Sequence, residues 1–142
     1  MGSAAVSRSL AVPAAEVWKV IADFNGMNNW HPAVTASTMT GKCHGAVRTL
    51  TITGLGAVVE SLEEFDETAM RLVYSASELP LPARDYLGTI QVNADGEGSC
   101  IITWSGNFIA DGAPEEDMVA GLKGFYQSGL DSLADQLERS MR

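Results

Sequence analysis

Two oppositely charged residues, Arg48 and Glu60, stand on either side of a short glycine turn, Gly54-Leu55-Gly56. If this turn joins two antiparallel strands and is centred on Gly54, Arg48 lies directly opposite Glu60. Side chains alternate along a strand, so Arg48 shares a face with Leu50 and Ile52, which favours the interior. The pair therefore has two interpretations: an ion pair that fixes the strand register, or a polar anchor for a ligand.

Aromatic side chains gather on the same predicted face in the strands that follow. Continuing the alternation gives the inward residues Leu72, Tyr74, Tyr86, Gly88, Ile90, Ile102, Trp104 and Phe108. Such a set is most often hydrophobic core, but Tyr74 and Tyr86 carry hydroxyl groups that need hydrogen-bond partners when buried. These two hydroxyls are candidates for orienting a small molecule.

Candidates for proton transfer are few. His31, in Trp30-His31-Pro32, titrates near neutrality and follows two short predicted helices, where we expect the mouth of a cavity; the alternative is a packed or surface residue. Glu60 and Tyr86 are further candidates, and Asp85 would form an acid pair with Glu60 if the two lie close together. The sequence shows no Ser-His-Asp order, metal-ligand cluster or phosphate-binding glycine loop, so we expect no cofactor and no metal.

The composition limits the class of protein. The chain has 142 residues, 46% of them hydrophobic, which predicts one domain over residues 1–142. The net charge of -9, with scattered basic residues, argues against nucleic acid and anionic membranes as partners. No leader or membrane span is expected, and Cys43 and Cys100 fit reduced thiols, so the sequence predicts a soluble, cytoplasmic protein. Its oligomeric state stays open between monomer and dimer.

Periodicity predicts a strand, two short helices, six more strands and a long helix. Alternating runs predict strands over residues 4–12, 34–40, 47–53, 58–65, 70–77, 84–92 and 99–109, and a turn over 41–45. Three-to-four-residue spacing predicts helices over 14–24, 27–30 and 114–142. The prolines in 78–82 exclude a central strand, so that segment is an apolar loop.

The predicted C-terminal helix is the element that the sheet must receive. Its apolar stripe consists of Met118, Leu122, Phe125 or Tyr126, Leu130, Leu133, Leu137 and Met141. The predicted helix contains three glycines, Gly121, Gly124 and Gly129. Their missing side chains either allow close packing on strands or leave space above a pocket. A helix roughly 40 Å long needs a broad, curved sheet, and that arrangement favours an apolar cavity between the two.

Short motifs along nearly the whole chain resemble those of a known superfamily. They are Val17-Trp18, Asp23-Phe24, Trp30-His31-Pro32, Gly45-Ala46-Val47-Arg48-Thr49-Leu50, Glu60, Leu62, Leu72-Val73-Tyr74, Pro80-Leu81-Pro82, Asp85-Tyr86, Thr103-Trp104 and Gly124-Phe125-Tyr126. Together they resemble the SRPBCC/START-like helix-grip superfamily, which includes the birch pollen allergen fold, and within it the polyketide cyclase/dehydrase-like branch. The resemblance implies an α+β fold: a curved seven-stranded antiparallel sheet around a long C-terminal helix, with two short helices after the first strand.

Residues 47–86 also resemble plant abscisic-acid receptors. Gly54-Leu55-Gly56-Ala57 stands where those receptors have a gate, and Leu79-Pro80-Leu81 where they have a latch. In this sequence the gate segment lacks the proline that the receptors have there. His31 stands near the position at which the receptors carry the lysine that contacts the hormone's carboxylate. The resemblance implies a cavity closed by the loops 54–57 and 78–84.

Three functions compete. The preferred one is binding of a hydrophobic or aromatic, lipid- or polyketide-like small molecule in the cavity. Its predicted contacts are Trp30, His31, Arg48, Glu60, Tyr74, Asp85, Tyr86, Trp104, Phe108 and Phe125. The second is a polyketide cyclase or dehydratase in which His31, Glu60 or Tyr86 relays protons in the same cavity. The third is a protein-binding or chaperone-type module, which predicts an exposed apolar patch.

Overall fold

A computed structural model describes residues 1–42 and 45–141 as seven strands and three helical segments. In chain order these are β1 (Gly2–Leu10), α1 (Ala14–Ala22), the 3-10 helix η1 (Met27–Asn29), β2 (Val34–Thr40), β3 (Val47–Ile52), β4 (Gly56–Asp66), β5 (Arg71–Glu78), β6 (Ala83–Ala94), β7 (Cys100–Ala110) and α2 (Glu115–Ser140). All seven strands form one antiparallel sheet in the order β1-β7-β6-β5-β4-β3-β2. The predicted α+β helix-grip fold is confirmed.

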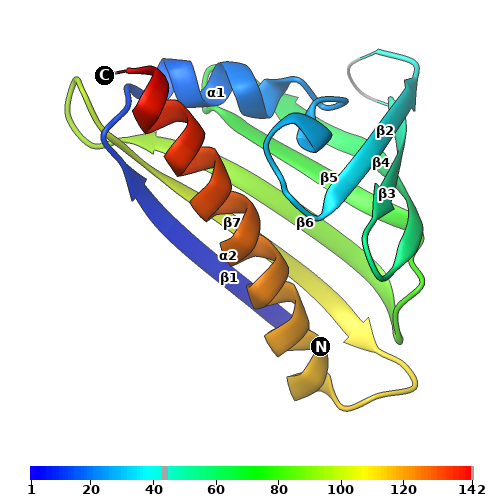
Figure 1. Cartoon of the computed structure of the whole chain (residues 1–142). Helices are drawn as coiled ribbons and strands as arrows, with labels where there is room; N and C mark the ends of the chain where they lie inside the picture. Colours follow the sequence, from blue (N-terminus) through cyan, green and yellow to red (C-terminus); the bar gives the residue numbers. More distant parts are fainter. Residues whose placement is uncertain (43–44, 142) are drawn as a thin grey trace.

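The sheet bends around the long helix. Figure 1 shows α2 crossing the side of the sheet formed by β1 and β7, which it contacts, while β2, β3 and β4 turn up at the opposite side. The α1 helix packs on β6 near the C-terminal end of α2. This bend leaves the N-terminal turns of α2 facing strands β3 to β5 across the interior.

Most predicted boundaries of helices and strands agree closely with the structure. The boundaries of the first strand differ, and a hydrogen bond explains where that strand ends. The strand predicted over 4–12 runs over Gly2–Leu10, because the Ala11 N–H leaves the sheet and donates to the Glu138 carboxylate at 2.9 Å. The predicted turn over 41–45 includes Cys43 and His44, which lie outside the described residues. Cys100 is a buried free thiol.

The register of β3 and β4 matches the prediction from the glycine turn. Arg48 is opposite Glu60, and Leu50 is opposite Val58. Gly54 has a φ of 79°, in the left-handed region that favours glycine, so the turn between the strands depends on this residue. A local turn signal thus fixes which side chains meet across the strands.

The inward residues predicted from alternation are all buried, and α2 contacts the sheet mainly at β1 and β7. Tyr126, rather than Phe125, is the fully buried aromatic of that stripe. The stripe ends earlier than predicted, since Leu137 is half-buried and Met141 is 53% exposed. Leu137 in the last helical turn still packs against the core, and the exposed Met141 follows the end of α2.

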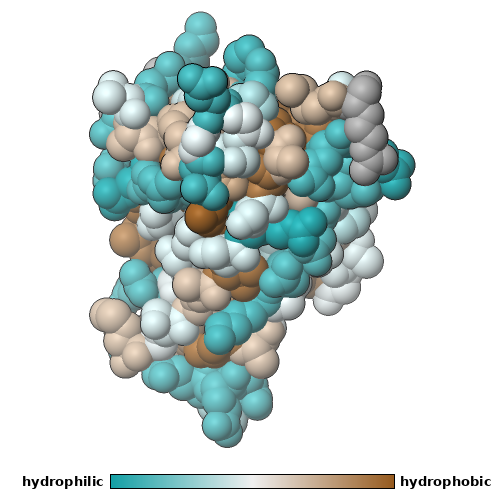
Figure 2. All heavy atoms as spheres, turned by 90° about the vertical axis from the view of Figure 1, so that its left-hand side faces the viewer, coloured by the Kyte–Doolittle hydropathy of each residue, from teal (hydrophilic) through white to brown (hydrophobic). Residues whose placement is uncertain are grey.

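The described surface offers little support for a docking patch. Its exposed large apolar side chains are Met1, Met39, Leu87 and Met141, which lie on four separate segments. Figure 2 shows one face, on which hydrophilic residues predominate and apolar residues form small separate spots. Within the described residues, no helix has the length and apolar character needed to cross a membrane.

Candidate functional site

A pocket of about 330 Å³ lies between the sheet and the first turns of α2. Its lining consists of Ile52, Thr53, Gly54, Leu55, Val58, Glu60, Tyr74, Leu79, Leu81, Tyr86, Asp117, Met118, Gly121, Leu122 and Phe125. Two loops border it, one between β3 and β4 and the other between β5 and β6. These are the two loops that the sequence resemblance implied for a cavity, and Leu55, Leu79 and Leu81 are their apolar contributions.

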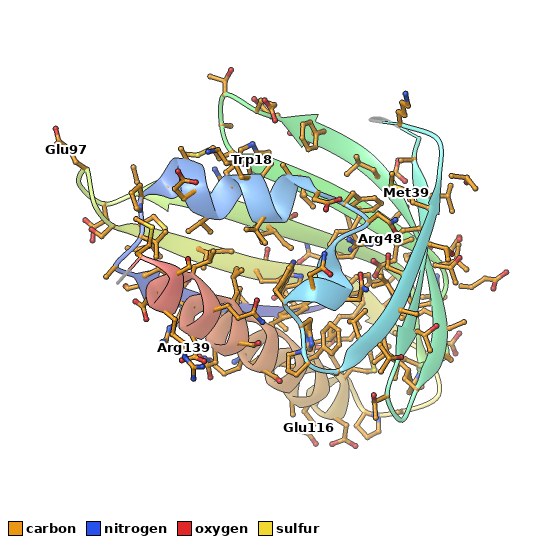
Figure 3. All side chains as sticks on the ribbon, turned by 45° about the horizontal axis from the view of Figure 1, so that its top comes forward. Trp18, Met39, Arg48, Glu97, Glu116 and Arg139 are labelled. Atoms are coloured by element: carbon orange, nitrogen blue, oxygen red, sulfur yellow. The ribbon has the colours of Figure 1, made fainter. Side chains whose placement is uncertain are left out.

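Arg48 and Glu60 form a buried ion pair at the inner side of this pocket. Their side chains are 3% and 8% exposed, and Arg48 Nε donates to Glu60 Oε1 at 2.8 Å. Arg48 Nη2 lies 2.7 Å from the same oxygen, and Nη1 donates to the Phe24 carbonyl at 2.7 Å. In Figure 3, Arg48 lies inside the molecule, whereas Glu97, Glu116 and Arg139 extend from its surface.

Aromatic rings enclose the guanidinium group. Its Cζ atom lies 3.9 Å from the ring centroid of Phe24 and 5.1 Å from that of Tyr74. Burial raises the pKa of Glu60, while the charge of Arg48 and its hydrogen bond oppose that rise. Glu60 is thus a buried carboxyl that is held by Arg48 and lines the pocket.

Three tyrosine hydroxyls meet beside this ion pair. Tyr74 and Tyr86 have their hydroxyl oxygens 3.2 Å apart, and Tyr86 is also hydrogen-bonded to Tyr126. The Trp104 indole N–H donates to the Tyr74 hydroxyl at 2.9 Å. Burial raises the pKa of all three tyrosines, so they carry their protons at neutral pH.

Two glycines make room for this tyrosine cluster. Gly88 on β6 lies directly opposite Gly106 on β7. A Cβ atom at Gly88 would overlap the ring of Tyr74, and one at Gly106 would overlap the Tyr126 hydroxyl. The cluster therefore depends on the absence of side chains at two adjacent points of the sheet.

His31 is a core residue rather than the mouth residue that we expected. It is 1% exposed, and the Ala33 N–H donates to its Nδ1 at 3.1 Å. Because Nδ1 is an acceptor, the proton lies on Nε2, which donates to the Phe125 carbonyl at 2.8 Å. The ring stacks on Phe125 with centroids 4.0 Å apart, and Gly129 of α2 leaves the space that the ring occupies. Both ring nitrogens are hydrogen-bonded within the fold, and His31 does not line the pocket.

The burial of His31 predicts a dependence of stability on pH. Burial lowers the pKa of His31 below its ordinary 6.5, although the hydrogen bond to Phe125 opposes this. Below pH 6.5 the unfolded chain binds the proton before the native state does, so the free energy of unfolding falls as the pH falls toward the native pKa. Urea unfolding of the wild type and His31→Gln from pH 7.5 to 5 checks this. The wild-type minus variant difference should shrink at low pH, and a difference independent of pH would contradict it.

The structure separates the predicted site residues into three groups. Glu60, Tyr74, Tyr86 and Phe125 line the pocket. The buried residues that do not line it are Trp30, His31, Arg48, Trp104 and Phe108. Asp85 is exposed, and its carboxylate contacts Arg84 at 3.0 Å. The structure does not bring Glu60 and Asp85 together as an acid pair, because Asp85 precedes the inward-facing Tyr86 on β6 and lies on the exposed face.

Some lining residues were not identified as site residues from the sequence. Met118 and Leu122 were predicted only as stripe residues, and the rotation of α2 shows that they also face the pocket, whereas Gly121 is one of the three glycines for which the sequence offered space above a pocket as an alternative. The sequence predicted Tyr126 as an alternative to Phe125 in the apolar stripe, but it did not predict the hydrogen bond between Tyr126 and Tyr86. The available signal was the cluster of small and apolar residues at the start of that helix.

Solved structures share this architecture over almost the full chain. Protein XoxI from Bacillus cereus is 27% identical, with a TM-score of 0.93, covering 100% of this chain and 99% of that one. A Thermobifida fusca protein is 30% identical, with a TM-score of 0.89, covering 98% of this chain and 95% of that one. The Zhui aromatase/cyclase from Streptomyces sp. R1128 is 16% identical, with a TM-score of 0.87, covering 99% and 95%, and this likeness concerns the fold alone. None of the curated proteins compared with this chain matches it.

The family match extends over the pocket as well as the fold. A family model described as polyketide cyclase / dehydrase and lipid transport matches residues 1–138. This range contains all seven strands and every residue that lines the pocket. The helix-grip resemblance found in the sequence is therefore confirmed, and the chain belongs to the polyketide cyclase/dehydrase and lipid transport family.

Proposed function

We propose that this protein binds a hydrophobic or aromatic small molecule, lipid-like or polyketide-like, between the sheet and α2. Family membership supports a ligand-binding or cyclase role. The observation that carries the proposal is the pocket, whose volume of about 330 Å³ lies within the range of small-molecule sites. Its walls are mostly apolar and its polar groups are few, as in sites that bury an apolar ligand and orient it by one end.

The lining suggests how such a ligand would lie. Leu55, Leu79 and Leu81 from the two loops, with Met118 and Leu122 from α2, would cover its apolar part. The buried polar residues of the lining, Glu60, Tyr74 and Tyr86, come from the central strands β4, β5 and β6, whereas Thr53 and Asp117 are exposed. A ligand would therefore place its polar group against the sheet and its apolar part under the loops and α2.

Gly121 provides a direct test of this proposal. It lines the pocket, and a Cβ atom at this position would meet no other atom within 4 Å. Gly121→Leu should raise the free energy of unfolding by up to about 1 kcal/mol, because leucine is a better helix former than glycine. The same side chain would occupy pocket space, so the affinity for a neutral, apolar fluorescent probe such as N-phenyl-1-naphthylamine should fall at least about tenfold. Probe titration and urea unfolding measure the two effects.

Gly124 is the matched control for Gly121. It lies in the same helix and also has open space around its Cβ position, but it does not line the pocket. Gly124→Leu should therefore bring a similar gain in stability with unchanged probe affinity. Equal loss of affinity in both variants, or no loss in Gly121→Leu, would contradict binding in this pocket.

A second candidate function is catalysis in the same pocket, favoured by one observation. Glu60, whose pKa burial raises, lines the pocket together with the protonated hydroxyls of Tyr74 and Tyr86. A carboxylate that accepts a proton from an activated CH₂ group and a hydroxyl that stabilises the resulting enolate would support cyclisation or loss of water. Mass spectrometry of a synthetic poly-β-ketone incubated with the wild type and Glu60→Gln tests it. Product formation equal to that without protein would contradict an enzymatic role toward this substrate.

A further inference from the structure

The ion pair leaves one carboxylate oxygen of Glu60 without a partner. Arg48 Nε donates to Oε1, and Nη2 lies 2.7 Å from the same oxygen as part of the ion pair without making a hydrogen bond to it, while Oε2 accepts no hydrogen bond from a described residue. Glu60 lines the pocket, whereas Arg48 does not. Because a carboxylate has two oxygens that both accept hydrogen bonds, the pocket is offered an acceptor rather than the guanidinium donor behind it.

The charges of the residues that line the pocket also disfavour an anionic ligand. Glu60 and Asp117 are both acidic, and none of the described lining residues is Lys or Arg. The positive charge of Arg48 is compensated by Glu60 and covered by Phe24 and Tyr74. Because Glu60 lines the pocket and Arg48 does not, an anionic group entering it would meet the carboxylate of the pair rather than the guanidinium group, and like charges in a desolvated site repel strongly.

The tyrosine cluster adds a donor. Its three hydroxyls and the Trp104 indole N–H supply four protons, but the hydrogen bonds among them number three. One hydroxyl proton therefore has no acceptor within the cluster. Tyr126 is fully buried away from the pocket, whereas Tyr74 and Tyr86 line it, so leaving the proton on one of these two avoids burying an unsatisfied donor.

We infer that the pocket selects neutral ligands that carry a hydroxyl group, such as phenols and alcohols, over carboxylates of the same skeleton. A hydroxyl group both donates and accepts, so it complements Glu60 Oε2 and the remaining tyrosine proton together. A carboxylate can use the tyrosine proton but is repelled by Glu60. This inference rests on the proposed function and deepens it by naming the polar group of the ligand.

Three probes with one skeleton test the inference: naphthalene, 2-naphthol and 2-naphthoate. At pH 7 the second is neutral and the third is an anion. Isothermal titration calorimetry on the whole protein should show 2-naphthol binding at least about tenfold more tightly than 2-naphthoate. Equal or tighter binding of 2-naphthoate would overturn the inference, while naphthalene binding would leave the proposed function standing. Failure of all three to bind would overturn the proposed function itself.

Glu60→Gln and Glu63→Gln form a matched pair of variants. Both remove one negative charge from β4, but Glu63 is exposed on the outer face of the strand. Glu60→Gln should reduce the preference for 2-naphthol over 2-naphthoate at least about fivefold, and Glu63→Gln should leave it unchanged. An equal effect of both would overturn the local role of Glu60. If Glu60→Gln does not fold, Tyr86→Phe serves instead: it should weaken 2-naphthol binding without weakening naphthalene binding, and equal weakening of both would overturn the inference.

Discussion

Replacing Arg48 by Met is expected to lower the free energy of unfolding by about 3–5 kcal/mol, the range found when one partner of a buried ion pair is removed. Methionine fills much of the space of the arginine stem, so lost packing adds little. The main loss arises because Glu60, with a side chain 8% exposed, stays buried without a compensating charge. Urea unfolding monitored by tryptophan fluorescence measures the change.

Two further variants separate the buried pair from ordinary surface charge. Arg71→Met removes the cation of an exposed pair on the neighbouring strands, in which Arg71 and Glu64 lie 3.7 Å apart, and should cost less than about 1 kcal/mol. The double variant Arg48→Met/Glu60→Gln should be more stable than Arg48→Met alone, since no unpaired charge remains. A double variant less stable than the single one would contradict this account.

The pH dependence of Arg48→Met provides an independent check. Burial raises the native pKa of Glu60 above its ordinary 4.5, and loss of Arg48 removes the interaction that opposes this rise. The native state then binds a proton at a higher pH than the unfolded chain does. The variant should therefore regain stability relative to the wild type as the pH falls through the native pKa of Glu60. A stability difference that is constant between pH 8 and pH 5 would argue against an unpaired carboxylate.

Gly106→Ala is expected to lower the free energy of unfolding by about 1–3 kcal/mol, although alanine usually favours a strand over glycine. The added methyl group would overlap the Tyr126 hydroxyl and lie 2.9 Å from a ring carbon of Tyr86. Both rings belong to the buried cluster and cannot move without disturbing Trp104, which stacks on Tyr126 with centroids 4.6 Å apart. Thermal and urea unfolding measure the loss.

The overlap with one named atom makes the Gly106 prediction specific. Tyr126→Phe in the Gly106→Ala background removes the overlapping oxygen and should restore part of the lost stability. Gly98→Ala is the control, because a Cβ atom there would meet nothing within 4 Å, and its effect should stay within about 0.5 kcal/mol. Wild-type stability of Gly106→Ala would show that the cluster is not tightly packed.

Local sequence signals predicted the parts of the site that depend on neighbouring strands. The turn at Gly54 and the two-residue alternation of strands were sufficient to place Arg48 opposite Glu60. They were equally sufficient to point Tyr74 and Tyr86 inward. In both cases the information lies within one hairpin or one strand, where backbone geometry leaves few alternatives.

Contacts between elements that lie far apart in the chain could not be predicted from the sequence. His31 donates to the carbonyl of Phe125, 94 residues away, and neither residue alone indicates that pairing. On α2, Phe125 and Tyr126 are adjacent in the stripe, and only the rotation of the helix decides that Tyr126 joins the hydroxyl cluster while Phe125 lines the pocket. Asp85 was misplaced although it directly precedes the inward-facing Tyr86, so that two-residue alternation by itself points Asp85 to the exposed face.

Glu60 belongs to the fold and to the pocket at once, and this limits how ligand preference can diverge among related proteins. A substitution at Glu60 alone leaves the charge of Arg48 buried without a compensating charge. A change at position 60 is therefore expected to require a compensating change at position 48. Leu79, Leu81 and Gly121 line the same pocket without taking part in that pair, and they are free to vary one at a time. In this protein a change of specificity is therefore expected to need fewer substitutions in the two loops and on the helix face than at the buried ion pair.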